Sequence, residues 1–84
     1  YQASKAAANF ATVDFAKELA DEGITVNSVN PGWTATGFGG RDESKPPIPG
    51  MQSIQDGAKH VVEMATTSSK DTLTFTETAG PLPW

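Results

Sequence analysis

The chain has 84 residues, which is enough for one compact domain at most. Ten acidic and six basic residues give a net charge of −4, which argues against a nucleic-acid-binding surface. No apolar stretch approaches the ~18 residues of a membrane span, and no signal-peptide pattern or basic amphipathic helix is present, so no membrane partner is expected. The absence of cysteine excludes disulfides and thiolate zinc sites and fits a reducing, cytoplasmic compartment. The single histidine, His60, lies near no nucleophile motif and is interpreted as an ordinary helix residue, so no metal or Ser-His-Asp site is predicted.

Residues 1–22 are predicted to form one helix. They are rich in alanine and contain no glycine or proline, and Gly23 is a natural stop just past the end. On a helical wheel, Phe10 and Val13 lie on one side and Phe15 lies almost opposite. A helix that is apolar on two sides is expected to be buried on both, against a sheet on one side and against another helix or subunit on the Phe10 side. Both phenylalanines are interpreted as core.

Tyr1 and Lys5 stand four residues apart, so on a helix they share one face with their Cβ atoms roughly 5–6 Å apart. A phenol titrates near ~10 and is a poor acid-base catalyst at neutral pH. A neighbouring positive charge favours the phenolate and brings the tyrosine pKa down toward the working range. The ammonium can also donate to a polyol such as a ribose. Such a pair alone is usually a solvated surface contact, and the segments that follow make it a candidate catalytic pair.

Residues 24–29 are predicted to form a short strand, because they contain Ile24, Val26 and Val29 with the β-branched Thr25 and are followed by an Asn-Pro-Gly turn sequence. A helix, a glycine and a short apolar strand form the αβ half of a βαβ arrangement. In an open α/β sheet, ligands bind beyond the carboxyl ends of the strands, so residues 31–36 are expected to face a ligand. The glycine of this segment permits close approach, and its peptide groups and the hydroxyls of Thr34 and Thr36 can bind an amide.

These motifs, in this order and at this spacing, resemble the second half of a short-chain dehydrogenase/reductase over nearly the whole chain. The matching residues are Tyr1, Ala3, Ser4, Lys5, Gly23, Ile24, Val26, Asn27, Val29, Pro31, Gly32 and Thr36. The resemblance implies an α/β fold in which residues 1–84 are a single partial domain. This domain would be the C-terminal half of a Rossmann-like, doubly wound parallel sheet that binds NAD(H) or NADP(H), in the order helix, strand, loop, helix, strand.

The resemblance also assigns roles to residues. Tyr1 matches the catalytic acid/base that exchanges a proton with a small-molecule carbonyl or alcohol substrate. Lys5 matches the lysine that lowers the tyrosine pKa and holds the nicotinamide ribose. Ser4 is interpreted as structural, because the catalytic serine of the family lies upstream of the tyrosine. The segment that holds the nicotinamide end of the cofactor is matched by Pro31, Gly32, Thr34 and Thr36.

Residues 37–52 are predicted to form a loop, because they are rich in glycine and proline and show no periodicity. A loop of this length is functional or disordered rather than a mere connector, and in the family it covers the substrate. Phe38 and Met51 are candidates for lining the substrate pocket; the alternative is that each only anchors the loop. Arg41 is interpreted as an exposed loop arginine, and the alternative is that it binds a cofactor phosphate or an acidic substrate.

Ser53 is predicted to cap a second helix, with an acidic residue three positions later. Its apolar stripe, interpreted as core, consists of Ile54, Ala58, Val61, Val62 and Ala65. Residues 72–76 alternate and are predicted to form a last strand, parallel to strand 24–29 through the helical crossover. The ending Gly80–Trp84, together with Gly57-Ala58, resembles carbonyl-reductase-like members, so NADP(H) is expected rather than NAD(H). Alternatively, Trp84 caps an edge of the core.

Several family features do not occur in these residues, among them the glycine-rich dinucleotide loop, the catalytic serine and the residue that selects NAD or NADP. The 84-residue chain alone is therefore expected to be inactive and poorly stable. Homo-oligomers are expected through the 1–22 helix. One alternative is a non-enzymatic fragment that acts as a self-associating or complementing interaction module. Another is that the Tyr1–Lys5 spacing is chance and the chain is a small α/β binding module.

Overall fold

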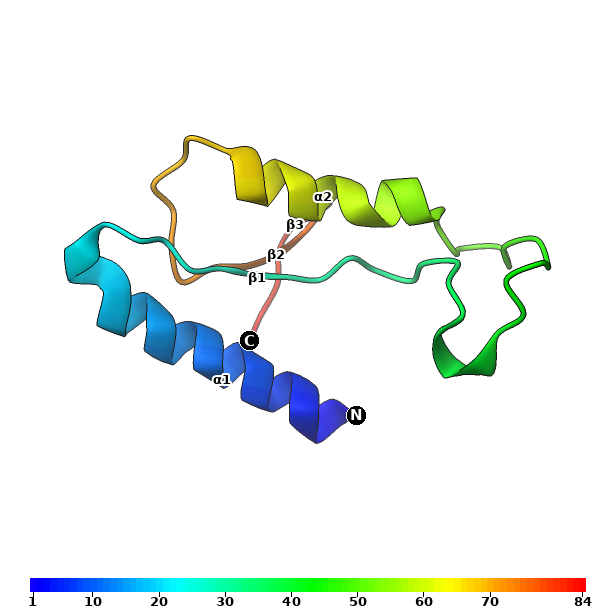
Figure 1. Ribbon diagram of the computed structural model, residues 1–84, viewed down its shortest axis with the longest axis horizontal. Helices are drawn as coiled ribbons and strands as arrows, with labels where there is room; N and C mark the ends of the chain where they lie inside the picture. Colours follow the sequence, from blue (N-terminus) through cyan, green and yellow to red (C-terminus); the bar gives the residue numbers. More distant parts are fainter. The chain divides into compact units, whose positions relative to one another are not determined.

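The computed structural model describes residues 1–84 as two units, one formed by Tyr1–Asn30 with Ser68–Trp84 and the other by Pro31–Thr67. The first unit contains the long helix and the three-stranded sheet, and the second contains the long loop and the second helix (Figure 1). Helices and a parallel strand pair together make this an α/β chain, as the sequence predicts. None of its helices combines the length and apolarity that a membrane crossing requires.

Helix α1 (Gln2–Leu19) runs into a tighter 3-10 turn, η1 (Ala20–Glu22). Gly23 then adopts the left-handed conformation with φ 74°. Its N–H donates to the carbonyl of Ala20 at 3.1 Å, and the N–H of Ile24 donates to the carbonyl of Leu19 at 3.4 Å. These two bonds form a Schellman motif, in which a glycine satisfies the last helical carbonyls at no steric cost. The predicted helix over 1–22 and its stop at Gly23 are confirmed.

The sheet has the order β1-β2-β3. Strand β1 (Ser28–Val29) pairs in parallel with β2 (Phe75–Glu77), and β2 pairs antiparallel with β3 (Gly80–Pro81). The predicted parallel pairing of the two strands is therefore confirmed. Strand β3 is an addition, formed when the chain turns back on itself after β2.

Both predicted strands are shorter than expected. Between them, the N–H of Leu73 donates to the carbonyl of Val26 at 2.9 Å and the N–H of Ser28 donates to the carbonyl of Thr74 at 2.8 Å, so pairing begins before the regular strands. Leu73 has a φ of 60°, which extended strand residues do not adopt. That backbone kink moves the start of β2 to Phe75, against a predicted start at residue 72.

Helix α1 lies against the sheet through small and polar side chains. The hydroxyl of Ser28 on β1 donates to Oδ1 of Asn9 at 2.9 Å, and Ala16 is 3 % exposed. Phe10 and Phe15 are 67 % and 52 % exposed, so the prediction that both are core is wrong within this chain. Each follows or precedes one of these contact residues by one position, and a step of one residue turns the helix by about 100°, to the flank of the covered face.

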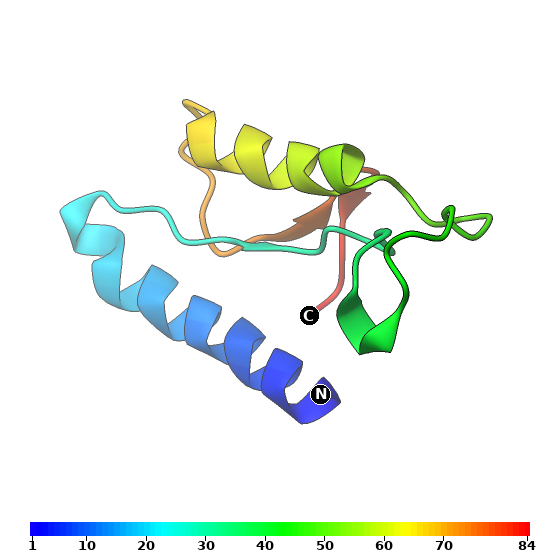
Figure 2. The ribbon, with the colours of Figure 1, turned by 45° about the vertical axis from the view of Figure 1, so that its right-hand side comes forward.

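In the second unit, α2 (Ile54–Thr66) begins at the predicted cap. The N–H of Asp56 donates to the hydroxyl of Ser53 at 3.1 Å, which satisfies one of the free N–H groups of the first helical turn. The preceding residues 37–52 form the predicted loop, with one 3-10 turn, η2 (Phe38–Gly40), inside it (Figure 2).

The apolar stripe of α2 that the sequence predicts to be core is exposed, and a different face of the helix contacts the rest of the unit. Ile54, Val61 and Val62 are 56 %, 46 % and 57 % exposed, so the prediction that the stripe is core is wrong for this chain. The buried residue of α2 is Gly57, whose backbone lies against the side chain of Thr34. Contact on this side is set by a glycine, because only the absence of a side chain allows the helix to approach that closely.

Candidate active site

The first group of predicted site residues is the Tyr1–Lys5 pair at the start of α1. Nζ of Lys5 lies over the Tyr1 ring, 5.3 Å from its centroid, and the backbone N–H of Lys5 donates to the carbonyl of Tyr1 at 3.1 Å. The helix therefore brings the two side chains together as the spacing predicts. A cation over an aromatic face within ~6 Å is attracted by the ring quadrupole. Tyr1 is 76 % exposed, so its phenol is accessible to a reaction partner.

Ser4 supports this turn of the helix. Its hydroxyl donates to the carbonyl of Tyr1 at 2.6 Å. A serine hydroxyl that binds a carbonyl of the preceding turn is a local backbone contact. This contact agrees with the structural interpretation of Ser4 drawn from the sequence.

The second group is the Pro31–Thr36 segment of the second unit. Gly32 has a φ of 82°, a left-handed conformation that favours glycine. Thr34 forms an isolated parallel bridge with Gln52. The side-chain amide of Gln52 donates to the carbonyl of Pro31 and, at 3.1 Å, to the hydroxyl of Thr34. The structure therefore brings Pro31, Gly32 and Thr34 together around one glutamine.

Most polar groups of this segment bind inside it. The Thr34 hydroxyl donates to the carbonyl of Gly32 at 3.1 Å, and the N–H of Thr36 donates to the carbonyl of Thr34 at 2.9 Å. The Thr36 hydroxyl accepts from the N–H of Phe38 at 3.2 Å. The N–H groups of Trp33 and Thr34 donate to no group of the chain. In a parallel bridge, the peptide groups of the bridged residue point away from its partner, so the Thr34 N–H is directed away from Gln52.

This arrangement fits the amide end of a nicotinamide dinucleotide. A carboxamide oxygen needs an N–H donor that is not already engaged, and Thr34 supplies one. A side chain on residue 32 would fill part of the segment, because a Cβ there would lie 3.0 Å from Nε2 of Gln52. The hydroxyls of Thr34 and Thr36, which the sequence nominates as amide ligands, are used to fold the segment.

Arg41 binds the loop to which it belongs. Its guanidinium donates to the carbonyls of Lys45 and Pro46 at 3.0 and 3.2 Å and, more weakly, to that of Thr36 at 3.5 Å. Arg41 is half-buried, so the interpretation as an exposed loop arginine is wrong. Whereas Arg41 donates to carbonyls of the loop, the carboxylate of Glu43 accepts from a loop N–H, that of Gly37, at 2.9 Å. Two charged side chains thus close the loop by satisfying its peptide groups.

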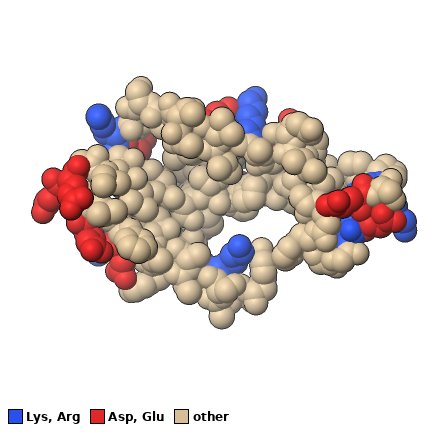
Figure 3. Space-filling view, viewed as in Figure 1, with Lys and Arg blue, Asp and Glu red and all other residues tan.

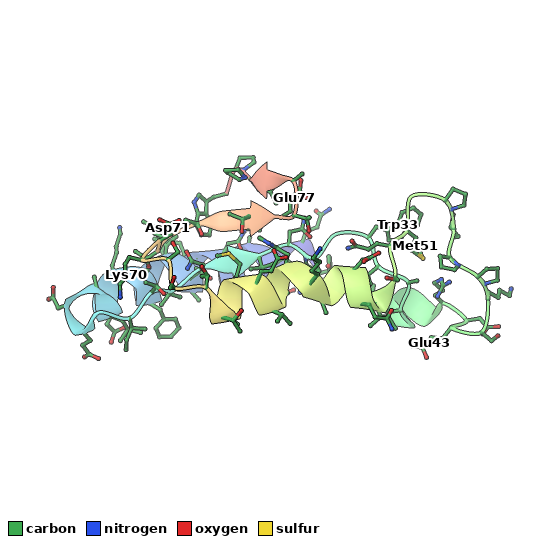
Figure 4. The ribbon with its side chains drawn as sticks, turned by 90° about the horizontal axis from the view of Figure 1, so that it is seen from above. Trp33, Glu43, Met51, Lys70, Asp71 and Glu77 are labelled. Atoms are coloured by element: carbon green, nitrogen blue, oxygen red, sulfur yellow. The ribbon has the colours of Figure 1, made fainter.

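The two candidate substrate residues lie at either end of the loop. Phe38 is 74 % exposed, and Met51 is half-buried with its N–H donating to the carbonyl of Ile48 at 2.9 Å. Figure 4 shows Trp33 beside Met51, and a Cβ on Gly50 would lie 3.6 Å from the Trp33 ring. Trp33, which is 56 % exposed, is an apolar neighbour of Met51 that the sequence reading did not single out.

Charge is distributed unevenly over the chain. Acidic side chains gather at the end of α1, where Asp21 and Glu22 lie, whereas both signs occur on the long loop (Figure 3). His60 lies on α2 with Nδ1 3.9 Å from the carboxylate of Glu63, and its side chain is 13 % exposed. No group of three or more His, Asp or Glu side chains is arranged to hold a metal ion.

The helices and the parallel strand pair together define an α/β protein. A comparison with family models matches residues 1–46 to the short chain dehydrogenase family, which is more than half of the chain. The chain belongs to the short-chain dehydrogenase family, whose members generally use NAD(H) or NADP(H). Comparisons with curated proteins and with solved structures gave no match. The matched range contains Tyr1, Lys5 and the Pro31–Thr36 segment, and it ends before Met51 and the tail.

Proposed function

We propose that this chain supplies the proton-transfer and nicotinamide-binding residues of an oxidoreductase that interconverts a carbonyl and an alcohol with NADP(H). The observation that carries the proposal is the Tyr1–Lys5 pair, in which an accessible phenol and an ammonium 5.3 Å from the ring centroid meet on the first turn of α1. This pair lies in a segment that the family match covers.

In the proposed reaction, Tyr1 handles the proton. When the carbonyl is reduced, its carbon receives a hydride and its oxygen receives the phenolic proton, which leaves a phenolate. In the reverse direction the phenolate accepts the proton of the alcohol. The positive charge of Lys5 stabilises the phenolate, since an opposite charge nearby favours the ionised form. Lys5 also has further N–H donors for the hydroxyls of a ribose.

The cofactor-binding residues in this proposal are Lys5, Pro31, Gly32, Thr34 and Thr36. When bound, the dinucleotide supplies or accepts the hydride. The support is that the segment presents an unengaged N–H at Thr34 and that Gly32, in a left-handed conformation, leaves room for the Gln52 amide that holds the segment. The preference for NADP(H) over NAD(H) is supported by the resemblance of the tail, residues 80–84, to carbonyl-reductase-like members.

The substrate in this proposal is a small carbonyl or alcohol that the 37–52 loop covers. Phe38 and Met51 are its candidate apolar contacts, with Trp33 beside Met51. Arg41 and Glu43 hold the loop together through its own peptide groups and are not proposed as ligands.

Substitution of the pair tests this function. Tyr1→Phe in the complete enzyme is expected to lower NADPH-dependent carbonyl reduction by about 10²–10⁴-fold, the usual contribution of a positioned acid-base group. Lys5→Met is expected to lower turnover, because the phenolate that proton donation leaves behind loses its neighbouring positive charge. Lys17→Met, an exposed lysine on the same helix, is the matched control and leaves the rate unchanged.

The measurement is the initial rate of NADPH oxidation as a function of NADPH concentration for all four proteins, which gives kcat and KM. Equal rates for wild type and Tyr1→Phe would end the catalytic assignment. A raised KM for NADPH with an unchanged kcat in Lys5→Met would limit Lys5 to binding.

A second candidate role is self-association through α1, and one observation favours it. Beside the sheet, an apolar hollow is lined by Ala6, Asn9, Phe10, Val13 and Trp84. Phe10 is 67 % exposed at its rim. A second copy of α1 would bury this face, since two-fold contacts between identical patches are the commonest way in which soluble chains assemble.

A further inference from the structure

Gln52 is the residue that holds the Pro31–Ala35 segment, through its backbone N–H, its backbone carbonyl and its side-chain NH2 group. Its backbone N–H donates to the carbonyl of Trp33 at 2.8 Å, and its carbonyl accepts from the N–H of Ala35 at 2.8 Å. Its side-chain amide donates to the carbonyl of Pro31 and to the hydroxyl of Thr34. A segment with no regular secondary structure is thus fixed at four points by one residue that lies some twenty positions away.

The fit between the side chain and the segment is close. A Cβ on Gly32 would lie 3.0 Å from Nε2 of Gln52, so the amide occupies the space above the glycine. Gln52 is half-buried, whereas Gln55, three residues later on α2, is exposed. A buried side-chain amide that is hydrogen-bonded fixes the local conformation, because other conformations would leave the amide without a hydrogen-bond partner, which costs free energy.

The consequence concerns the direction of the Thr34 N–H. The carbonyl of Trp33 points to the backbone N–H of Gln52, so the Thr34 N–H, which belongs to the same trans peptide group, points to the opposite edge. The side-chain amide of Gln52 holds this peptide group in place from both sides, through the carbonyl of Pro31 and the hydroxyl of Thr34. The donor that the proposed dinucleotide needs is therefore presented by Gln52, although Gln52 uses its own donors within the protein.

We propose that Gln52 is the positioning residue of the nicotinamide-binding segment, which sets the orientation of the Thr34 N–H toward the carboxamide. This inference rests on the proposed NADP(H)-dependent function. It predicts that the loss of the Gln52 side-chain amide weakens binding of the nicotinamide end and leaves the rest of the dinucleotide unaffected.

The test, made in the complete enzyme, compares two variants with a matched control. Gln52→Met removes the donor without adding charge, Gln52→Glu keeps the shape and replaces the donor with an oxygen, and Gln55→Glu places the same charge on the exposed face of α2. Dissociation constants are measured for NADPH and for 2′-phospho-ADP-ribose, which lacks the nicotinamide. Hydrogen exchange of the Thr34 and Ala35 amides is measured without any ligand.

Both Gln52 variants are expected to bind NADPH about tenfold more weakly, as the loss of a hydrogen bond implies, with 2′-phospho-ADP-ribose unaffected. The Ala35 amide is expected to exchange faster in both, and Gln55→Glu is expected to match wild type. Unchanged NADPH affinity, or an equal loss for both ligands, overturns the positioning role. A wild-type protein that binds neither NADPH nor NADH overturns the proposed function, and this inference with it.

Discussion

Asp42 is the residue of the long loop whose ionisation depends most clearly on the fold. The hydroxyl and the N–H of Ser44 donate to its carboxylate at 2.6 and 2.9 Å and hold its pKa below the usual range, and the guanidinium of Arg41 lowers it further. A carboxyl whose folded pKa is lowered stabilises the fold above its unfolded pKa, near ~3.9, and loses that contribution as pH falls through the folded value. Order in the Arg41–Lys45 turn is therefore expected to decline only in strong acid.

A carboxyl-carbon NMR titration measures this effect directly. Ser44→Ala removes the hydroxyl that donates to the Asp42 carboxylate, so the Asp42 pKa is expected to rise toward its ordinary value. Identical Asp42 titrations in the two proteins would show that Ser44 does not hold the carboxylate.

Asn27 is expected to be the polar residue on which the parallel pairing depends most. Its Oδ1 accepts from the N–H and the hydroxyl of Thr74 at 3.0 and 2.6 Å, and its Nδ2 donates to the carbonyl of Asp71 at 3.0 Å. Asn27→Ala leaves the half-buried Thr74 N–H without a partner, which costs about 1–3 kcal/mol. Asn27→Asp keeps the acceptor and is expected to lose less. The free energies of unfolding of wild type, Asn27→Ala and Asn27→Asp are measured in urea. An equal loss of stability in both variants would contradict the role of Oδ1.

Gln52 shows why part of the site cannot be read from the sequence. Tyr1 and Lys5 are four residues apart, so helix geometry alone brings them together. The partners of Gln52 lie at Pro31–Ala35, and no local spacing connects them across the irregular loop. In the sequence, Gln52 is only a polar residue just before the helix cap Ser53. Its role cannot be inferred until the fold shows which residues it contacts.

At the scale of elements, the helix ends were predictable and the strand limits were not. Gly23 and Ser53 mark their helix ends by local chemistry, a left-handed glycine and a hydroxyl that accepts from the first turn. The strands depend on partners far along the chain. The positive φ of Leu73 could not be predicted, because leucine rarely adopts that conformation. The β2–β3 turn at Thr78-Ala79 also lacks the Asn-Gly or Asp-Gly pair typical of two-residue hairpins.

Helix α2 is seated on the Pro31–Thr36 segment through Gly57. Exchange of a helical glycine for alanine ordinarily stabilises a helix by about 1 kcal/mol. Here a Cβ on residue 57 would lie 2.7 Å from both Cγ2 and Oγ1 of Thr34, whose hydroxyl is already held by Gln52 and Gly32. The threonine would have to rotate and give up these bonds. Gly57→Ala is therefore expected to lower the free energy of unfolding by about 1–3 kcal/mol, the usual cost of overpacking.

Thermal unfolding of Gly57→Ala checks this expectation, with Lys59→Ala on the exposed part of α2 as the control. A higher Tm for Gly57→Ala would mean that helix propensity outweighs the contact with Thr34.

At the scale of the whole molecule, the stability of the chain is limited by how little apolar side-chain surface it buries. The only buried hydrophobic residue is Ala16, which is 3 % exposed. Large apolar side chains on both helices remain about half exposed or more, including Phe10, Phe15, Ile54 and Val62. Each apolar side chain of this size gains roughly 1.5–3 kcal/mol when it is fully buried, so these faces are the largest unused source of stability in the chain.

The α1 face is where this stability is expected to be gained. A second copy would cover Phe10 and the hollow that Trp84 borders, and Trp84 is itself held to the sheet with its ring centroid 5.5 Å from that of Phe75. The helicity of the 84-residue chain is therefore expected to rise with concentration. Phe10→Glu places a charge at the centre of the contact and is expected to abolish this dependence. Phe38→Glu, which adds the same charge at a side chain of similar exposure, is expected to preserve it. Circular dichroism and sedimentation equilibrium over a hundredfold dilution measure both effects, and a folded monomer at the lowest concentration would argue against assembly through α1.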